Sequence, residues 1–155
     1  MSSDRISRER TIRARPADIF AVLTDIDQHR AIDGSDTLRG QAEGPRPLVL
    51  GSVFTMAMHQ VLGYRTRNTV VEYEPDRLVA WETRSHLGPL SIGGHRWRYE
   101  LAPDGEDTRV TETLDWGTAP WWFGRPLSRV GYFTHFGPAI EATLKRLATH
   151  VERPA

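Results

Sequence analysis

Three side chains that could hold or transfer a proton fall on one face of a predicted β-hairpin: His95, Tyr99 and Glu112. Alternation along residues 95–101 places His95 and Tyr99 on the same face as apolar neighbours, with arginines on the other face. Alternation along residues 108–117 places Glu112 among apolar residues in the same way. Such a carboxyl group is expected to have a raised pKa. Together the three groups could orient a ligand or act as general acid and base.

The same residues also fit a purely structural role. Glu112 could be a buried carboxyl that one hydrogen-bond partner satisfies, or a one-residue slip in strand register could turn it to solvent. His95 lies near a strand end, where a histidine is often a surface residue or a satisfied one. The catalytic role of these residues is therefore an expectation that depends on the register of the hairpin.

A second set of residues is predicted to line the interior. In the predicted strand 51–61, large apolar side chains alternate with smaller ones, and methionine adapts to ligands of varied shape. Ordinary core packing explains any one of them as well. The predicted ligand-binding residues are Phe54, Met56, Met58, Trp81, His95, Trp97, Tyr99, Glu112, Trp116, Tyr132, Phe133 and Phe136.

Residues 116–124 contain four large aromatic side chains, which are too many to leave in water. They could close the mouth of a pocket, dock a partner or form a homodimer contact. Trp116 and Phe123 are expected to pack where the next helix meets the sheet. The run Trp121-Trp122-Phe123 is a candidate interaction surface.

The elements that must position these residues form an α+β pattern. A strand at 5–14 precedes a short helix that starts near Pro16 and a second helix or turn at 25–33. Six strands are predicted at 36–43, 51–61, 65–74, 78–86, 94–102 and 108–117. A long amphipathic helix is predicted over 125–152, kinked or restarted at Pro138. A long helix on a curved antiparallel sheet can enclose a cavity.

Five segments carry a family resemblance: RTIRARPADIFAVLTDID, GSVFTMAM, VVEYEPDRLVAWE, WRYELAPDGEDTRVTETLDW and EATLKRLATHVE. In their order and spacing they resemble the START-like, helix-grip (SRPBCC) superfamily, and within it the bacterial polyketide cyclase/dehydrase-like branch. The resemblance implies a seven-stranded antiparallel sheet curved around the C-terminal helix, with an internal pocket for an apolar or aromatic ligand. It implies no particular reaction, because a fold does not fix a function.

Composition limits the other possibilities. The 155 residues fit one domain, 1–155, with a core of about 5–152. Twenty basic and twenty acidic residues balance, which argues against nucleic acid as a partner. The sequence has no cysteine and no nucleotide-binding motif, and its six histidines do not have the spacing of metal ligands. Neither a metal nor a cofactor is therefore expected. No apolar run is long enough for a membrane span, and a cytoplasmic location is expected.

The leading hypothesis is a module that binds a small hydrophobic or aromatic molecule, polyketide-like or lipid-like, in an internal cavity. One alternative is a cofactor-independent aromatase/cyclase or dehydratase that uses Glu112, His95 or Tyr99. Another is a protein-interaction module that uses Trp121-Trp122-Phe123. Convergence of the three polar groups on one point would favour the enzyme.

Overall fold

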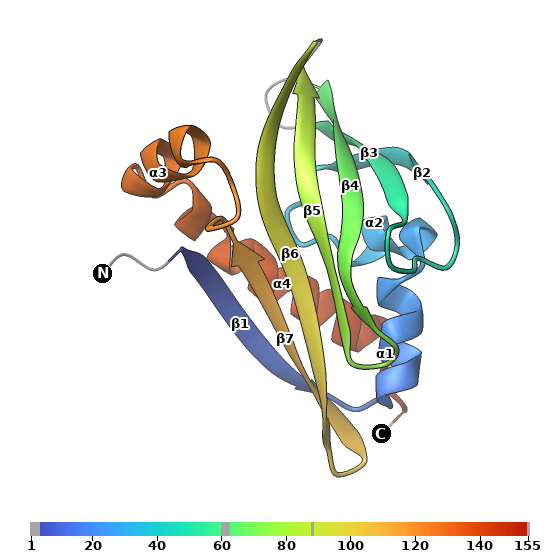
Figure 1. The fold of residues 1–155 in the computed structure, drawn as a ribbon. Helices are drawn as coiled ribbons and strands as arrows, with labels where there is room; N and C mark the ends of the chain where they lie inside the picture. The colour runs from blue at the N-terminus through green and yellow to red at the C-terminus, as the bar shows by residue number, and fades with distance from the viewer. Residues whose placement is uncertain (1–3, 60–62, 88, 155) are drawn as a thin grey trace.

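The chain folds as one antiparallel sheet curved around a long helix (Figure 1). The computed structural model describes residues 4–59, 63–87 and 89–154. The strands are β1 (Arg5–Ile12), β2 (Leu38–Glu43), β3 (Val53–His59), β4 (Gly63–Glu74), β5 (Leu78–Leu87), β6 (Leu90–Asp104) and β7 (Asp107–Asp115). The helical elements are α1 (Pro16–Leu23), η1 (Ile26–Gln28), α2 (His29–Ile32), α3 (Trp121–Arg129), η2 (Phe133–Phe136) and α4 (Gly137–Val151). The predicted α+β, helix-grip architecture is confirmed.

The sheet is a meander with one exception. Its order is β1-β7-β6-β5-β4-β3-β2, so only β1 leaves the sequential order, and it pairs with β7. Register shifts occur in β4 and between β5 and β6, and such bulges bend the strands they interrupt. At the second shift Gly94 is the extra residue. A Cβ on its neighbour Gly93 would lie 2.6 Å from the carbonyl oxygen of Thr83, so only glycine fits this bend.

Two short helices follow β1, as predicted. α1 begins at Pro16, where the missing N–H removes no helical hydrogen bond. Its buried side chains include Ile19, Phe20 and Leu23, the apolar face expected from their spacing. η1 and α2 then carry the chain to the start of β2.

The C-terminal region differs from the single helix expected over 125–152. α3, η2 and α4 are separate elements. Gly131 ends the first of them in a left-handed conformation, with φ of 73°, that glycine adopts at little cost. The prediction was therefore wrong for the segment before α4. The restart expected at Pro138 is confirmed, because this proline lies in the first turn of α4.

Two strand boundaries also need correction. Gly93-Gly94 forms a bulge inside β6, so this strand begins at Leu90, before the start predicted at 94. β7 ends before Trp116, which places that side chain beyond the strand. The last two residues of the predicted strand 51–61 lie outside the described residues.

α4 covers the concave side of the sheet with one apolar face. Its buried residues recur at helical spacing: Ile140, Thr143, Leu144, Leu147 and Ala148. The loop after α2 packs directly on this helix, because a Cβ on Gly34 would lie 2.2 Å from the carbonyl oxygen of Ala139. This close approach brings the residues beside Gly34 over the first half of α4.

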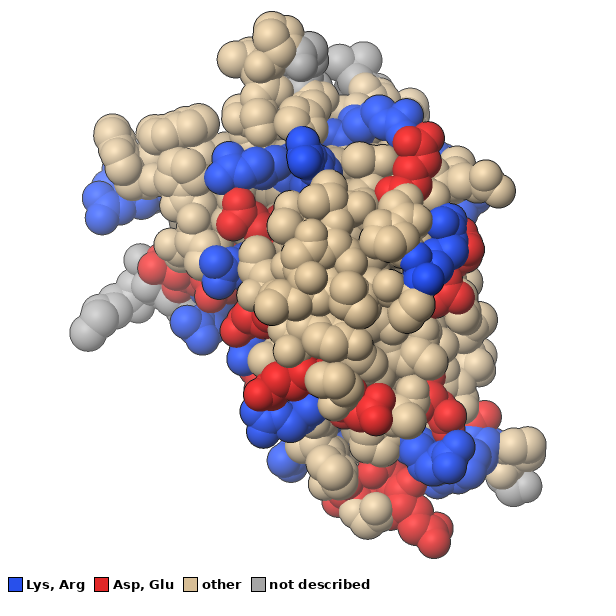
Figure 2. Space-filling model, turned by 45° about the vertical axis from the view of Figure 1, so that its right-hand side comes forward, with Lys and Arg blue, Asp and Glu red and all other residues tan. Residues whose placement is uncertain are grey.

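The outer surface carries both signs of charge. Figure 2 shows basic and acidic side chains close together around a broad area of other residues. Ion pairs on the outside of the sheet include Arg98 with Glu72 at 3.0 Å and Arg84 with Glu82 at 3.1 Å. Among the described helices, none is long and apolar enough to cross a membrane.

Candidate functional site

A cavity of about 660 Å³ lies between the sheet and the first half of α4. β3, β4, β5, β6 and β7 form one wall, and α4 contributes Ala139, Ile140 and Thr143 to the other. Ten of the twelve residues predicted to bind a ligand border it: Met56, Met58, Trp81, His95, Trp97, Tyr99, Glu112, Tyr132, Phe133 and Phe136. The inward faces expected from alternation in β3, β6 and β7 therefore meet in one place.

Glu112 and Tyr99 form a buried pair in the cavity wall. They lie directly opposite each other in the register of β6 and β7. The Tyr99 hydroxyl donates a hydrogen bond to Glu112 Oε1 at 2.9 Å, whereas Glu112 Oε2 is buried with no hydrogen-bond partner. Burial raises the pKa of Glu112 to about 8, although the hydrogen bond from Tyr99 works in the opposite direction.

Asp33 faces the same cavity and was not predicted as a site residue. Its Oδ1 accepts hydrogen bonds from the backbone N–H and the hydroxyl of Ser35, at 3.0 and 2.6 Å. Its Oδ2 accepts from the backbone N–H groups of Thr37 and Leu38, both at 3.0 Å. The charge of Asp33 contributes to the raised pKa of Glu112. The cavity thus contains two carboxyl groups in different environments. Asp33 accepts four hydrogen bonds, whereas Glu112 accepts one.

His95 lies apart from this pair. Tyr99 is four positions further along β6, which corresponds to about 13 Å in an extended strand. Its ring stacks on Phe123 and tilts against Phe133, with centroids 6.4 and 6.1 Å away. Its Nδ1 is buried with no hydrogen-bond partner, and burial lowers the pKa of His95 to about 4. The structure therefore joins Glu112 with Tyr99 but does not bring the three predicted groups to one point.

Trp81 is the centre of an aromatic wall. Its indole stacks on His29 at 5.3 Å and contacts the rings of Phe54 and Tyr99 at 5.5 and 5.6 Å. His29, which sequence reasoning missed, is fixed because its Nε2 lies 2.7 Å from the carbonyl oxygen of Leu23. Burial lowers the pKa of His29, so the wall is uncharged at neutral pH.

A polar cluster on β4 and β5 was also missed. Thr83 donates to Asn68 Oδ1 at 2.8 Å, and Asn68 Nδ2 donates to Thr66 at 3.2 Å. All three border the cavity and are buried. The signal was present in the sequence, since Thr66 and Asn68 alternate with Arg65 and Arg67 in the predicted strand 65–74.

Phe54 and Trp116 are buried as expected but do not border the cavity. Phe54 is covered by the rings of His29 and Trp81, at 5.7 and 5.5 Å. Trp116 lies beyond the end of β7 and stacks on Phe133 with centroids 4.8 Å apart. Both side chains support residues that form the wall.

The aromatic run at the start of α3 is divided between inside and outside. Phe123 packs on His95, at one end of the cavity. Trp121 and Trp122 remain 71% and 53% exposed. The predicted three-ring interaction surface is therefore reduced to two rings, and Trp122 lies where the cavity meets the outer surface.

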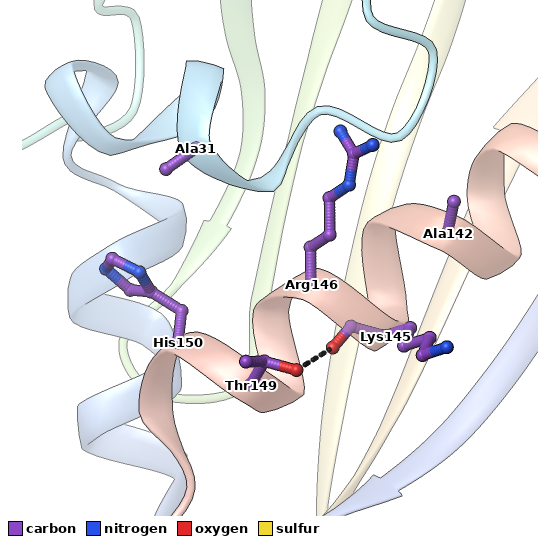
Figure 3. A pocket seen from close by; sticks show the side chains of 6 residues that line it. All are labelled: Ala31, Ala142, Lys145, Arg146, Thr149 and His150. Carbon is purple, nitrogen blue, oxygen red and sulfur yellow. Dashed lines mark hydrogen bonds between the residues drawn. The ribbon is translucent and has the colours of Figure 1, made fainter.

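A second hollow lies outside, where α2 meets the far face of α4 (Figure 3). Its volume is about 650 Å³. The residues that line it are Ala31, Ala142, Lys145, Arg146, Thr149 and His150. Arg146 pairs with Asp36 at 2.9 Å, and Thr149 donates to the carbonyl oxygen of Lys145 at 3.1 Å. Four of the six residues that line this hollow have polar or charged side chains, and several of these groups are already paired.

Charge and metal-ligating groups are sparse around the inner cavity. The described residues that border it include no lysine or arginine. Across the described part of the chain, no three His, Asp or Glu side chains are grouped so that they could hold a metal ion. What the inner cavity offers is an apolar, aromatic interior with a few fixed polar groups.

Known proteins show the same sequence pattern and fold. Residues 3–152 match the family described as polyketide cyclase / dehydrase and lipid transport. The uncharacterized protein Rv0088 of Mycobacterium tuberculosis is 38% identical over 159 aligned positions, which cover 96% of this chain and 65% of the relative. This chain therefore spans a little less than two thirds of the length of that relative.

Two solved structures show the likeness of fold. Protein CV1439 from Chromobacterium violaceum has a TM-score of 0.67 and 15% identity, with 97% of this chain and 99% of that one covered. DynU16, a protein of the dynemicin biosynthetic locus, has a TM-score of 0.61 and 14% identity, with 97% of this chain and 49% of that one covered. At these identities the structures support the fold alone. The family match over residues 3–152 shows that this chain belongs to the polyketide cyclase/dehydrase and lipid transport family.

Proposed function

We propose that this chain binds a small hydrophobic or aromatic molecule in the cavity between the sheet and α4. The observation that carries the proposal is a cavity of about 660 Å³ whose walls are mainly apolar and aromatic. Pockets for drug-sized ligands have volumes of roughly 300 to 1,000 Å³ and combine apolar walls with a few polar groups. Close-packed protein interiors rarely keep a void of this size without a use for it.

The framework around the cavity also supports the proposal. Trp81, His29 and Tyr99 hold one another in ring contacts on one side. Phe123 and Phe133 are held by contact with each other, 6.3 Å apart, on the side of α3. A wall made of rings that contact one another keeps its shape when the cavity is empty, which lowers the entropy lost on binding.

Native mass spectrometry of the purified protein tests the proposal. We expect a noncovalent adduct of small-molecule mass that denaturing extraction releases and identifies as an apolar compound. The matched control is Met58→Trp, which puts an indole into the cavity from β3 and should remove the adduct. Protein that carries no adduct and fails to bind a panel of apolar and aromatic fluorescent probes would contradict the proposal.

A second candidate is a cofactor-independent cyclase or dehydratase acting on a polyketide-like substrate. The observation that favours it is Glu112, whose pKa of about 8 suits proton transfer near neutral pH inside the cavity. Glu112→Gln should then abolish turnover of a bound polyketide-like compound while binding is retained. If the variant turned the compound over as fast as the wild type, or if the wild type did not turn it over, the catalytic role of Glu112 would be contradicted. Binding would then remain the proposed function.

A further inference from the structure

Several polar side chains around the cavity are already hydrogen-bonded within the protein. Asp33 accepts four hydrogen bonds. Thr83 donates a hydrogen bond to Asn68, which in turn donates one to Thr66. Thr143 accepts from the backbone N–H of Gly34 and donates to the carbonyl oxygen of Ala139. Among the described residues that border the cavity, a buried polar atom without a partner occurs only in the two residues named next. They are Glu112, through Oε2, and His95, through Nδ1.

An unpartnered polar atom in an apolar cavity is costly unless a ligand satisfies it. Glu112 is only 2% exposed, so water outside the protein does not solvate its carboxyl group. The two unpartnered atoms are therefore positions at which a ligand that reaches them would gain hydrogen bonds that the empty protein lacks.

The charges around the cavity exclude an anionic ligand. The described lining contains the carboxyl groups of Asp33 and Glu112 and no lysine or arginine. A carboxylate or phosphate inside would meet no cation and would lie near Asp33. Burying an unpaired charge in this way costs several kcal/mol. Free fatty acids with buried carboxylates and phosphorylated ligands with buried phosphates fit poorly.

The hydrogen bond between Tyr99 and Glu112 also bears on where a neutral Glu112 carries its proton. Tyr99 donates to Oε1, so the proton of the neutral carboxyl group resides on Oε2, the oxygen that has no partner. The raised pKa, about 8, agrees with a neutral carboxyl at pH 7. In this form Oε2 is a donor and its partner in the ligand must be an acceptor, such as a carbonyl oxygen.

His95 provides the second polar contact, about 13 Å along β6 from the Tyr99–Glu112 pair. Its ring is neutral at pH 7, since its pKa is about 4. A hydroxyl group can donate to a bare ring nitrogen or accept from a protonated one, so it suits either tautomer. Between the two points lies Trp97, which alternation places on the same face and whose ring contacts Phe136 at 5.8 Å.

We propose that the cavity selects uncharged molecules with a ring-containing apolar body, a carbonyl oxygen that accepts from Glu112, and a hydroxyl group that reaches His95. This inference rests on the proposed function and specifies the chemical class of its ligand. It separates neutral aromatic ketones and phenols from ionised lipids.

Four naphthalenes test this inference by fluorescence titration at pH 7. 6-Acetyl-2-naphthol carries both groups, 2-acetylnaphthalene lacks the hydroxyl, 2-ethylnaphthalene lacks both, and 2-naphthoate is an anion. We expect 2-naphthoate to bind at least about a hundredfold more weakly than 2-acetylnaphthalene, because its charge is unpaired. We expect the hydroxyl of 6-acetyl-2-naphthol to tighten binding by about three- to tenfold.

Variants locate the two contacts. In the double variant Glu112→Leu, Tyr99→Phe, no unpaired polar group remains, and the affinity of 2-acetylnaphthalene relative to 2-ethylnaphthalene should fall by about tenfold. Glu112→Gln keeps a donor at the same place, so its ketone affinity should remain within about threefold at pH 7. At pH 9 it should exceed that of the wild type, whose carboxyl group is ionised. His95→Phe should remove the advantage of the hydroxyl.

The outcomes separate this inference from the proposed function. If none of the four compounds binds, the proposed function and the inference both fail. If they bind, but 2-naphthoate matches 2-acetylnaphthalene or the double variant leaves the ketone-to-hydrocarbon ratio unchanged, the inference fails and the proposed function stands. Circular dichroism and thermal unfolding verify that each variant is folded, and Glu112→Gln keeps the test decisive if the double variant is not.

Discussion

Two hollows of nearly equal volume lie on opposite faces of α4, about 660 Å³ inside and about 650 Å³ outside. The inner cavity is bordered by Ile140 and Thr143 and by aromatic side chains of the sheet. The outer hollow is bordered by Lys145, Arg146 and His150. One amphipathic helix therefore separates two environments, because its faces alternate with the helical period.

The difference lies in how the polar groups are satisfied. In the outer hollow Arg146 pairs with Asp36, and His150 Nε2 lies 2.5 Å from Gln28 Oε1. In the inner cavity Glu112 and His95 each keep a buried atom without a partner. Volume alone does not distinguish a binding site from a surface depression. Unsatisfied polar atoms within apolar walls do, since a ligand gains most from contacts that the empty protein cannot make.

The largest expected effect is on the free energy of unfolding, when a residue that lines the inner cavity or the outer hollow is replaced. Trp81→Ala should lower the free energy of unfolding by about 3 to 5 kcal/mol, because the indole packs against three other rings. A substitution in the outer hollow, Thr149→Ala, should alter it by about 0.5 kcal/mol or less, because the side chain is smaller and lies at the surface. Urea denaturation monitored by circular dichroism measures both. Similar losses of unfolding free energy in the two variants would contradict the difference between the inner cavity and the outer hollow.

The next effect concerns ligand binding in the two hollows. Met58→Trp fills part of the inner cavity and should weaken binding of 2-acetylnaphthalene by about tenfold or more. Lys145→Trp places the same side chain in the outer hollow and should leave the affinity within about twofold. Fluorescence titration of the two variants measures the contrast. If Lys145→Trp weakened binding more than Met58→Trp does, the ligand would bind in the outer hollow and not in the inner cavity.

The smallest effect is a pH dependence of stability that arises in the inner cavity. Folding raises the pKa of Glu112 to about 8, so the folded state holds a proton that the unfolded chain has already lost. Stability should therefore fall as pH rises, by about 1 to 1.5 kcal/mol between pH 7 and pH 9. The lowered pKa values of His29 and His95 act at lower pH, where both become charged only in the unfolded chain.

The groups facing Glu112 come from three neighbouring elements. Tyr99 on β6 donates to it, and Asp33 after α2 adds negative charge. Arg8 is its register partner on β1, but the guanidinium pairs with Glu141 on α4 at 2.7 Å. Glu112→Gln should remove the slope between pH 7 and pH 9 in urea denaturation. An unchanged slope in that variant would assign the pH dependence to another group.

Alternation in the sequence determined much of the inner wall. Because strand side chains point to opposite faces with a period of two, Met56, Trp97 and Glu112 could be placed inward from the pattern alone. The same local rules predicted the order of strands and helices and the restart at Pro138, since glycine, proline and apolar spacing act over a few residues.

The closure of the site depended on contacts between distant parts of the chain. Asp33, in the loop after α2, and His29, in α2 itself, reach the cavity where Gly34 lets that loop pack on α4, more than a hundred residues later. Phe54 is excluded because His29 and Trp81 cover it. Glu112 meets Tyr99 but not His95, because strand register sets distances that alternation leaves open. Sequence pattern thus determined which faces turn inward, and tertiary packing decided which inward side chains border the cavity and which of their atoms remain free for a ligand.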